Sequence, residues 1–252
     1  MPKLSVCIEM FWRDLPYHER IRRLAEVGYG AFEFWGWVNK DLDAIDRARR
    51  DTGLSVAAFC MHPDADLTRR NASEELVQGL AESIAVAQRL ECPTLIAMFG
   101  NTVDDETYEM TRRRVVAYLR LLRPLLEDSG LTLVLEPLNT LVNRHGYWLT
   151  RMSQAADIVD EVNSPAIRIL MDVYHQQISE GHIIANLRQY RRRIAHIHAA
   201  GVPERHELLG CELDYRSIFS AIDALDYSGY VGLEYWPTLD ESASLAQPLS
   251  FA

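Results

Sequence analysis

The sequence predicts a closed (β/α)8 barrel, and three observations support this fold class. Eight strand-like stretches alternate with helical stretches along the 252 residues. Most of these strand-like stretches are apolar almost throughout, which is typical of strands buried on both faces of a parallel sheet. Four consecutive strand-like stretches in the second half end in a carboxylate or an imidazole, where barrel enzymes place their functional side chains. This alternation over this length favours a barrel over an open doubly wound sheet.

The first half of the chain supplies four strand–helix pairs. Helices are indicated by apolar side chains on one face, such as Ile21, Leu24 and Ala25, and by glycines that end them at positions 28, 53 and 130. The expected strands are 4–9, 31–34, 54–60 and 94–98, and the expected helices are about 16–27, 42–52, 73–90 and 105–128.

The alternation continues through the second half without a linker or a low-complexity segment. The apolar run LTLVLEPLN, residues 131–139, reaches Glu136 at its end and is stopped by Pro137. The expected strands are 132–136, 167–172, 194–198 and 230–234, and the expected helices are about 151–162, 215–225 and, with a weaker pattern, 183–190. Residues 235–252 hold at most a short helix. We therefore expect one barrel domain over residues 1–252, and the lack of GxGxxG after the first strand gives a dinucleotide-binding fold no support.

The composition is that of an ordinary globular protein, with 48% hydrophobic and 25% charged residues. The sequence contains no apolar run of membrane-spanning length, and its start, MPKLSVCIEM, does not resemble a signal peptide. A cytoplasmic location and no membrane partner are therefore expected. Cys7, Cys60, Cys92 and Cys211 are far apart and form no CxxC pair, so we expect reduced thiols.

The chain carries a formal net charge of −10. This charge opposes a nucleic-acid partner, because affinity for phosphate backbones depends on Lys and Arg. One run of three arginines, at positions 191–193, is the best local basic patch. We expect it to follow a helix and face solvent, since cations are favourable at helix C-termini.

The four strand-end residues are Glu136, Asp172, His198 and Glu234. A charge at the end of an apolar run is costly unless something compensates it, and a divalent cation would do so. Three carboxylates and one imidazole suit Mn²⁺, Mg²⁺ or Co²⁺ better than a closed structural zinc site. The alternative is that these are unrelated loop residues, each capping or pairing locally.

Four sequence segments, LEPLN, MDVYH, HIHAAGVPER and GLEYWP, resemble those of the xylose-isomerase-like barrel superfamily, and within it the hydroxypyruvate isomerase family. The resemblance implies that the four strand-end residues bind the metal and that His175 and Arg205 contact substrate. His198 stands where hydroxypyruvate isomerases can have Gln and where ketose 3-epimerases have His. Gly201 stands where several relatives have Asp. A homo-dimer or homo-tetramer is also implied by the resemblance alone.

The residue types indicate a proton-transfer reaction. A metal that chelates the carbonyl and adjacent hydroxyl of a small hydroxy-keto acid or ketose acidifies the intervening C–H and stabilises the enediolate. Glu136 and Glu234 are expected to be the acid/base pair. The sequence thus predicts a metal-dependent isomerase, with hydroxypyruvate and tartronate semialdehyde as the substrates that the resemblance suggests.

Other candidates lie near the expected mouth of the barrel. For substrate contact they are His62, Asn139, Trp12, Trp35 and, beside them, Trp37. The histidine could instead make ordinary loop hydrogen bonds, and the tryptophans could pack between loops or subunits. His196 is expected to be a hydrogen-bonded core residue below the site, while Glu9 and Glu33 could support substrate hydroxyls or the metal ligands.

Three other functions remain open at this point, and a fourth, a DNA-repair endonuclease, is disfavoured. A ketose 3-epimerase is supported by His198, and a dehydratase or decarboxylase of an oxo-sugar or oxo-acid would use the same enediolate. A DNA-repair endonuclease of related fold would need more histidines at the strand ends. A barrel that binds sugar without catalysis predicts loss of the Glu136 and Glu234 pair, and both are present.

Overall fold

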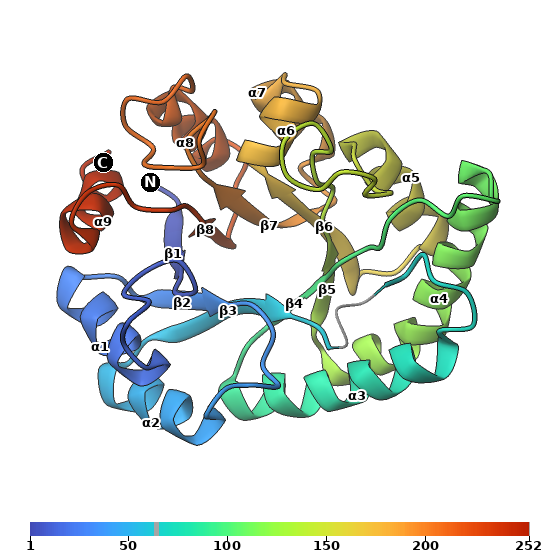
Figure 1. Ribbon diagram of the computed structural model, residues 1–252, viewed down its shortest axis with the longest axis horizontal. Coiled ribbons are helices and arrows are strands. Elements are labelled where there is room, and N and C mark those ends of the chain that lie inside the picture. The colour runs from blue at the N-terminus through green and yellow to red at the C-terminus, as the bar shows by residue number, and fades with distance from the viewer. Residues whose placement is uncertain (63–65, 252) are drawn as a thin grey trace.

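Eight parallel strands close into a barrel in the computed structural model, which describes residues 1–62 and 66–251. Each strand pairs with its neighbour in sequence, and β8 returns to pair with β1 (Figure 1). The strands are β1 (Lys3–Cys7), β2 (Ala31–Phe34), β3 (Ser55–Cys60), β4 (Thr94–Ala97), β5 (Thr132–Leu135), β6 (Ile167–Asp172), β7 (Ile194–Ala199) and β8 (Tyr230–Leu233). The expected barrel is confirmed.

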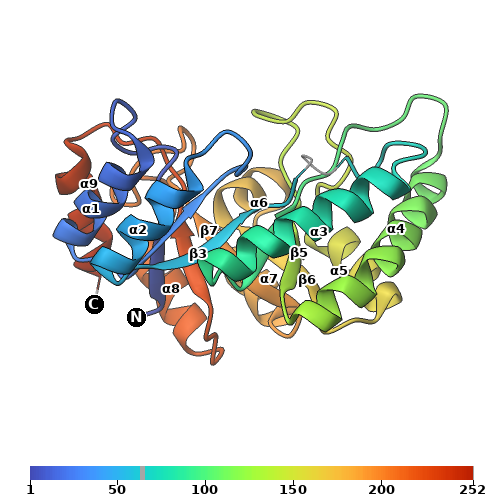
Figure 2. The same ribbon diagram turned by 90° about the horizontal axis from the view of Figure 1, so that it is seen from below.

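The helices surround the barrel, and the loops that follow the strands gather at one end of it (Figures 1 and 2). The helices are α1 (Tyr17–Val27), α2 (Leu42–Thr52), α3 (Ser73–Leu90), α4 (Tyr108–Ser129), α5 (Met152–Val162), α6 (Val173–Ser179), α7 (Ile183–Tyr190), α8 (Tyr215–Asp223) and α9 (Glu241–Leu249). Among the described residues, no helix is long and apolar enough to span a membrane. All four cysteines are free thiols, as expected.

Two features of the helices differ from the sequence-based expectation. Helix α6 was not expected, and it starts directly after β6 because Asp172 ends the strand and caps the helix. Helix α4 begins at Tyr108 rather than at 105, because the Thr107 side chain accepts a hydrogen bond from the backbone N–H of Met110.

Strands β5 and β8 end one residue before their glutamates, so Glu136 and Glu234 stand just beyond the paired backbone.

The inside of the barrel is apolar on one side and polar on the other. On the β3–β6 side, a small buried cluster fills it, made of Ala58, Cys60, Ile96, Val134 and Leu170. On the β7, β8, β1 and β2 side, the corresponding buried residues are polar, namely Ser5, Glu33, His196 and His198. The neighbours of these residues along the strands, such as Ile197 and Leu233, pack in the larger core beneath the helices. The polar half lies beside the candidate site.

Candidate metal and substrate site

The four strand-end residues converge. Each offers one ligand atom, and these atoms all lie within 4.8 Å of one another. The residues are buried, with exposed fractions of 5% for Glu136, 1% for Asp172, 3% for His198 and 7% for Glu234. Oxygen and nitrogen ligands surround a divalent ion at about 2.0–2.6 Å, so ligand atoms on opposite sides of one ion are about 4–5 Å apart. The spacing of the four therefore fits a single cation.

Asp172 uses its two carboxylate oxygens differently. Oδ1 accepts hydrogen bonds from the backbone N–H groups of Tyr174 (2.8 Å) and His175 (3.3 Å), which starts α6. Oδ2 faces the cluster and accepts from Arg205 Nη2 at 3.1 Å. Burial raises the pKa of Asp172, against the opposing effect of Arg205. The helix cap thus fixes the direction in which the second oxygen, Oδ2, points.

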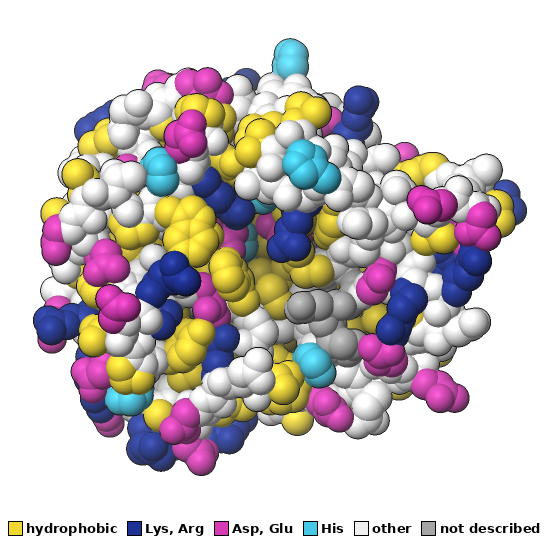
Figure 3. All heavy atoms as spheres, in the orientation of Figure 1, with side chains coloured by type: hydrophobic (Ala, Val, Ile, Leu, Met, Phe, Trp, Pro, Cys, Tyr) yellow, Lys and Arg dark blue, Asp and Glu magenta, His cyan; other side chains and the backbone are white. Residues whose placement is uncertain are grey.

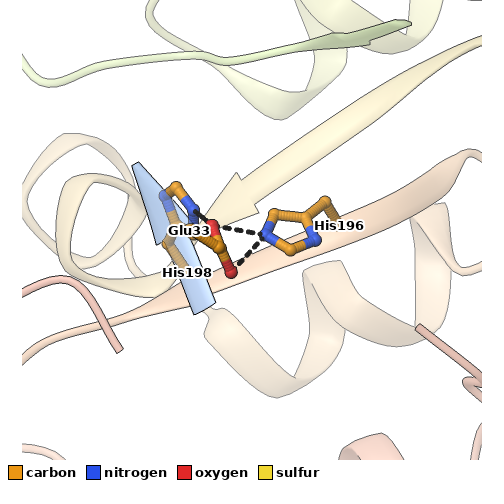
Figure 4. A group of neighbouring side chains, drawn as sticks. All are labelled: Glu33, His196 and His198. Atoms are coloured by element: carbon orange, nitrogen blue, oxygen red, sulfur yellow. Dashed lines mark hydrogen bonds and ion pairs between the residues drawn. The ribbon is translucent and has the colours of Figure 1, made fainter. Parts of the chain in front are cut away.

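His198 has one nitrogen in a hydrogen bond and one that lacks such a partner. Nε2 lies 2.9 Å from Glu33 Oε2 (Figure 4). Nδ1 is buried and makes no hydrogen bond, although Glu234 Oε2 lies 3.2 Å away and Glu136 Oε1 3.6 Å away. When Nε2–H donates to Glu33, Nδ1 presents its lone pair to the carboxylates. A buried imidazole nitrogen that has no hydrogen-bond partner and lies beside two carboxylates fits a metal ligand.

Glu33 supports this arrangement from inside the barrel. Both of its oxygens lie 3.1 Å from His196 Nε2 (Figure 4). Ser5 Oγ also donates a hydrogen bond to Glu33 Oε1. Burial alone would raise the pKa of Glu33, but His196 and His198 lower it well below its usual range. A Cβ at Gly232 would clash with Glu33 Oε1, so a residue without a side chain leaves room for the carboxylate. Glu33, His196 and His198 also meet the spacing of a metal-binding group, and Glu33 lies within hydrogen-bonding distance of both histidines.

Arg205 binds the cluster itself. Its Nη2 donates to Glu234 Oε2 at 2.6 Å as well as to Asp172, and its Nε donates to the Glu234 carbonyl at 3.2 Å. The guanidinium also lies over the Tyr174 ring. Burial would lower the pKa of Arg205, but the charges of Glu234 and Asp172 raise it, so the side chain stays charged. Arg205 and His198 in turn lower the pKa of Glu234 against the effect of burial.

Trp35 covers Glu234 from the loop after β2. Its indole N–H donates to Glu234 Oε1 at 2.7 Å. The backbone N–H of Trp35 donates to Glu9 Oε1 at 3.0 Å, and Lys40 Nζ lies 2.7 Å from the same oxygen. Glu9 therefore anchors the loop that carries Trp35.

His175 is oriented by Asn139. The Asn139 backbone N–H and side-chain amide lie 3.1 and 2.7 Å from His175 Nδ1. Because both groups are donors, Nδ1 accepts, and the proton of the neutral ring sits on Nε2. Burial, with the charge of Arg205, lowers the pKa of His175 to about 3. His175 is thus a neutral donor, with Nε2 3.7 Å from Asp172 Oδ2.

A cavity of about 340 Å³ opens above the cluster. On the face shown in Figure 3, a hollow near the centre is bordered by apolar, basic, acidic and histidine side chains. The lining residues are Trp35, Cys60, Asp66, Ile96, Met98, Phe99, Gly100, Glu136, Leu138, Arg144, His175, His198, Arg205 and Glu234. This volume lies at the small end of the range for ligand pockets.

Six of the candidate residues line this cavity, while four candidates for substrate contact do not, namely Trp12, Trp37, His62 and Asn139. The Trp12 backbone donates to Glu241 at 2.7 Å and its ring packs against Phe11. His62 contacts the Trp37 ring edge to face. Asn139 is fully buried behind His175.

Two charged lining residues, Asp66 and Arg144, were not expected from the sequence. Neither belongs to a periodic pattern, because both lie in loops. The apolar lining at the ends of β3 and β4, such as Cys60 and Met98, could have been found by the strand-end rule that located the acids.

The fold and the cluster define a parallel (β/α)8 barrel with carboxylates and an imidazole at the ends of its last four strands. The chain belongs to the xylose isomerase-like TIM barrel family, whose model matches residues 21–250. The resemblance to hydroxypyruvate isomerases indicated by the sequence motifs is also confirmed. A putative hydroxypyruvate isomerase of Danio rerio is 31% identical over 97% of this chain and 94% of its own length.

Other relatives share the fold under different names. A 2-oxo-tetronate isomerase of Cupriavidus necator is 30% identical over 97% of this chain and 96% of its own length. A crystal structure titled AP endonuclease, family 2, from Brucella melitensis has a TM-score of 0.94, with 29% identity and 99% of each chain covered. The 3-keto-D-glucoside 4-epimerase of E. coli, at a TM-score of 0.85 and 20% identity over 100% of this chain and 98% of its own, shares the fold.

Proposed function

We propose that this protein is a divalent-metal-dependent isomerase that moves a proton between adjacent carbons of a short hydroxy-keto acid. The convergence of Glu136, Asp172, His198 and Glu234 carries the proposal. Relatives that are similar over nearly their full length are named hydroxypyruvate and 2-oxo-tetronate isomerases, which act on such compounds. The small cavity above the cluster suits a substrate of a few carbons.

The same four residues would hold the cation, with His198 contributing Nδ1. When bound, the cation supplies Lewis acidity at the substrate carbonyl. Mn²⁺, Mg²⁺ and Co²⁺ suit three oxygen ligands and one nitrogen ligand. Glu33 holds His198 in the tautomer that leaves Nδ1 free.

Glu136 and Glu234 carry the proton transfer in this proposal. They follow β5 and β8 and approach His198 Nδ1 from different strands, at 3.6 and 3.2 Å. One carboxylate takes the proton from the carbon beside the carbonyl, and an enediolate results. Returning the proton to the neighbouring carbon, while the hydroxyl proton passes to the former carbonyl oxygen, completes an isomerisation. The His175 Nε2–H and Trp35 bind and enclose the substrate.

A ketose 3-epimerase is the second candidate, and His198 favours it because ketose 3-epimerases resemble this sequence at that position. In an epimerase, the second carboxylate returns the proton to the original carbon on the opposite face. The two reactions therefore need the same residues and differ in the carbon that receives the proton.

Isotope exchange separates these functions. The protein is incubated with Mn²⁺ in D₂O with hydroxypyruvate, 2-oxo-tetronate and ketoses, the metal is then chelated, and deuterium is located by NMR. With the wild type and a keto acid, we expect deuterium at the carbon that becomes the new carbinol centre. Glu136→Gln should not incorporate deuterium at this carbon. Deuterium at C3 of a ketose with inversion would indicate an epimerase, and loss of water or carbon dioxide a lyase. Exchange with no substrate would overturn catalysis and leave a sugar-binding barrel.

A further inference from the structure

The loop after β5 holds its shape through an asparagine pair. Asn139 Oδ1 accepts from the backbone N–H groups of Val142 (3.0 Å) and Asn143 (3.3 Å). Asn143 Oδ1 accepts from Asn139 Nδ2 (3.0 Å) and from the Tyr174 hydroxyl on α6 (2.9 Å). The next residue in this loop is Arg144. Its position therefore depends on hydrogen bonds within the loop and on the bond from Tyr174 of α6.

The backbone of Arg144 is fixed on both sides. Its N–H donates to the Asn139 carbonyl at 3.1 Å, and its carbonyl accepts from the Tyr147 N–H at 2.9 Å. The side chain lines the cavity together with Glu136 and His175. In the part of the chain that the structure describes, the Arg144 guanidinium makes no hydrogen bond and no ion pair. It is a charged group presented to the cavity with its donors unused.

Arg205 and Arg144 both line the cavity, but they differ in their contacts. Arg205 is engaged with Asp172 and Glu234, so its donors serve the cluster. The three carboxylates of the cluster carry three negative charges, which Arg205 and one divalent cation would balance. The cavity wall holds two further charges, Arg144 and Asp66, and Asp66 accepts hydrogen bonds from Thr68. The donors of Arg144 therefore remain available for an anionic group of a ligand.

We propose that Arg144 recognises the carboxylate of an open-chain 2-oxo acid of three or four carbons, and that it makes this site selective for such acids over neutral ketoses. This inference rests on the proposed function. A planar guanidinium matches a carboxylate with two parallel N–H donors, which a neutral hydroxymethyl group cannot use fully. The resemblance implies that Arg205 contacts substrate, and the present proposal adds Arg144 as the residue that binds the carboxylate.

Matched substrate pairs test the selectivity. Hydroxypyruvate is compared with dihydroxyacetone, and 2-oxo-tetronate with erythrulose, because each pair differs only in a carboxylate replaced by a hydroxymethyl group. The ratio of kcat/KM for acid over ketose is measured for the wild type, Arg144→Gln, Arg144→Lys and Arg47→Gln. Arg47 is an exposed arginine on α2 that does not line the cavity, so it controls for loss of one surface charge.

We expect Arg144→Gln to lower this ratio roughly ten- to a hundredfold, because it removes a charge-assisted hydrogen bond to a carboxylate. Arg144→Lys should retain part of the ratio, since it keeps the charge but not the paired donors. Arg47→Gln should match the wild type. An unchanged ratio in Arg144→Gln, with the wild type active on the acids, would overturn the role of Arg144 while the isomerase stands.

The affinity for compounds that cannot react tests carboxylate recognition by Arg144 without any need for catalytic turnover. Calorimetry compares erythronate with erythritol, which lack the carbonyl and differ in the carboxylate. Preference for erythronate in the wild type that is lost in Arg144→Gln would support the inference even if no isomerase activity is found. Equal binding of both compounds by the wild type would overturn it.

Discussion

Glu33 Oε2 lies 2.9 Å from His198 Nε2, and the two side chains come from opposite sides of the polar half of the barrel interior. This bond fixes the imidazole from behind, so that Nδ1 faces Glu136 and Glu234. Carboxylates behind ligating histidines raise the basicity of the ring and orient it. Glu33 is therefore expected to control cation affinity without contacting the cation.

Glu33→Gln should weaken binding of Mn²⁺ by about ten- to a hundredfold, since the amide removes the charge behind the imidazole. Calorimetric titration of the metal-free protein measures the dissociation constant. Glu207→Gln is the control, because Glu207 is also a buried, hydrogen-bonded carboxylate but lies outside the cluster. If Glu33→Gln bound Mn²⁺ as tightly as the wild type, the bond to His198 would have no role in metal binding.

Trp35→Phe is expected to lower kcat/KM about tenfold. The substitution keeps an aromatic ring over the cavity but removes the indole N–H that donates to Glu234 Oε1 at 2.7 Å. Trp37→Phe is a matched control, because Trp37 also loses one indole hydrogen bond, to Ser83 Oγ at 3.2 Å, outside the residues that line the cavity. Steady-state kinetics should show the loss only in the first variant. Equal losses in both would mean that the tryptophans act through loop packing alone.

The convergence of the four strand-end residues was predictable from the sequence, because parallel strands of a barrel end at the same edge. Glu136, Asp172, His198 and Glu234 each follow an apolar run, and parallel strands bring such ends to one edge. The same reasoning suggested Trp35, which lines the cavity, and Trp12, which does not. The backbone turns at Trp12 with a positive φ of 47°, and no periodic pattern in the sequence reveals such a turn.

The hydrogen-bond and ion-pair partners of the site residues could not be predicted from the sequence, because they lie far apart along the chain. The sequence indicated that His196 faces inward, yet it could not show that Glu33 lies between two histidines 163 and 165 positions away. Arg205 forms ion pairs with Asp172 and Glu234. These pairs depend on how the loop after β7 folds over the barrel. Arg144 lies in a loop whose shape comes from side-chain bonds between Asn139 and Asn143, so no spacing rule selects it.

Glu207 is expected to make part of the stability depend on pH. Its carboxylate accepts from Thr238 and Leu239, which precede α9, and from Ser244 Oγ within α9. These bonds join the loop after β7 to the C-terminal helix. Burial would raise the pKa of Glu207, but these hydrogen bonds lower it from 4.5 to about 2. A carboxylate with a lowered pKa stabilises the fold above the unfolded-state pKa and loses that contribution as the pH falls toward the folded-state value.

The contribution of Glu207 should therefore be complete above about pH 5 and be lost progressively between about pH 5 and pH 2, on the order of 2 kcal/mol in total. Urea unfolding of the wild type and Glu207→Gln from pH 7 to pH 3 measures it. The difference between the two proteins should shrink as the pH falls. The exposed Glu212→Gln should follow the wild type, and a constant difference for Glu207→Gln would contradict the prediction.

His175 should remain neutral, with its proton on Nε2, throughout the range from about pH 5 to pH 8. Burial and the charge of Arg205 lower its pKa to about 3, so acid strong enough to charge the ring lies below that range. Both Asn139 donors point at Nδ1, which fixes the tautomer that offers an N–H toward Asp172 and the cavity. Long-range ¹H–¹⁵N NMR spectra, with the resonance assigned through His175→Gln, should show a pattern of one protonated Nε2 that does not change with pH. Asn139→Ala should weaken the tautomer preference, whereas a titration of His175 near pH 6.5 in the wild type would show that this environment does not hold the ring neutral.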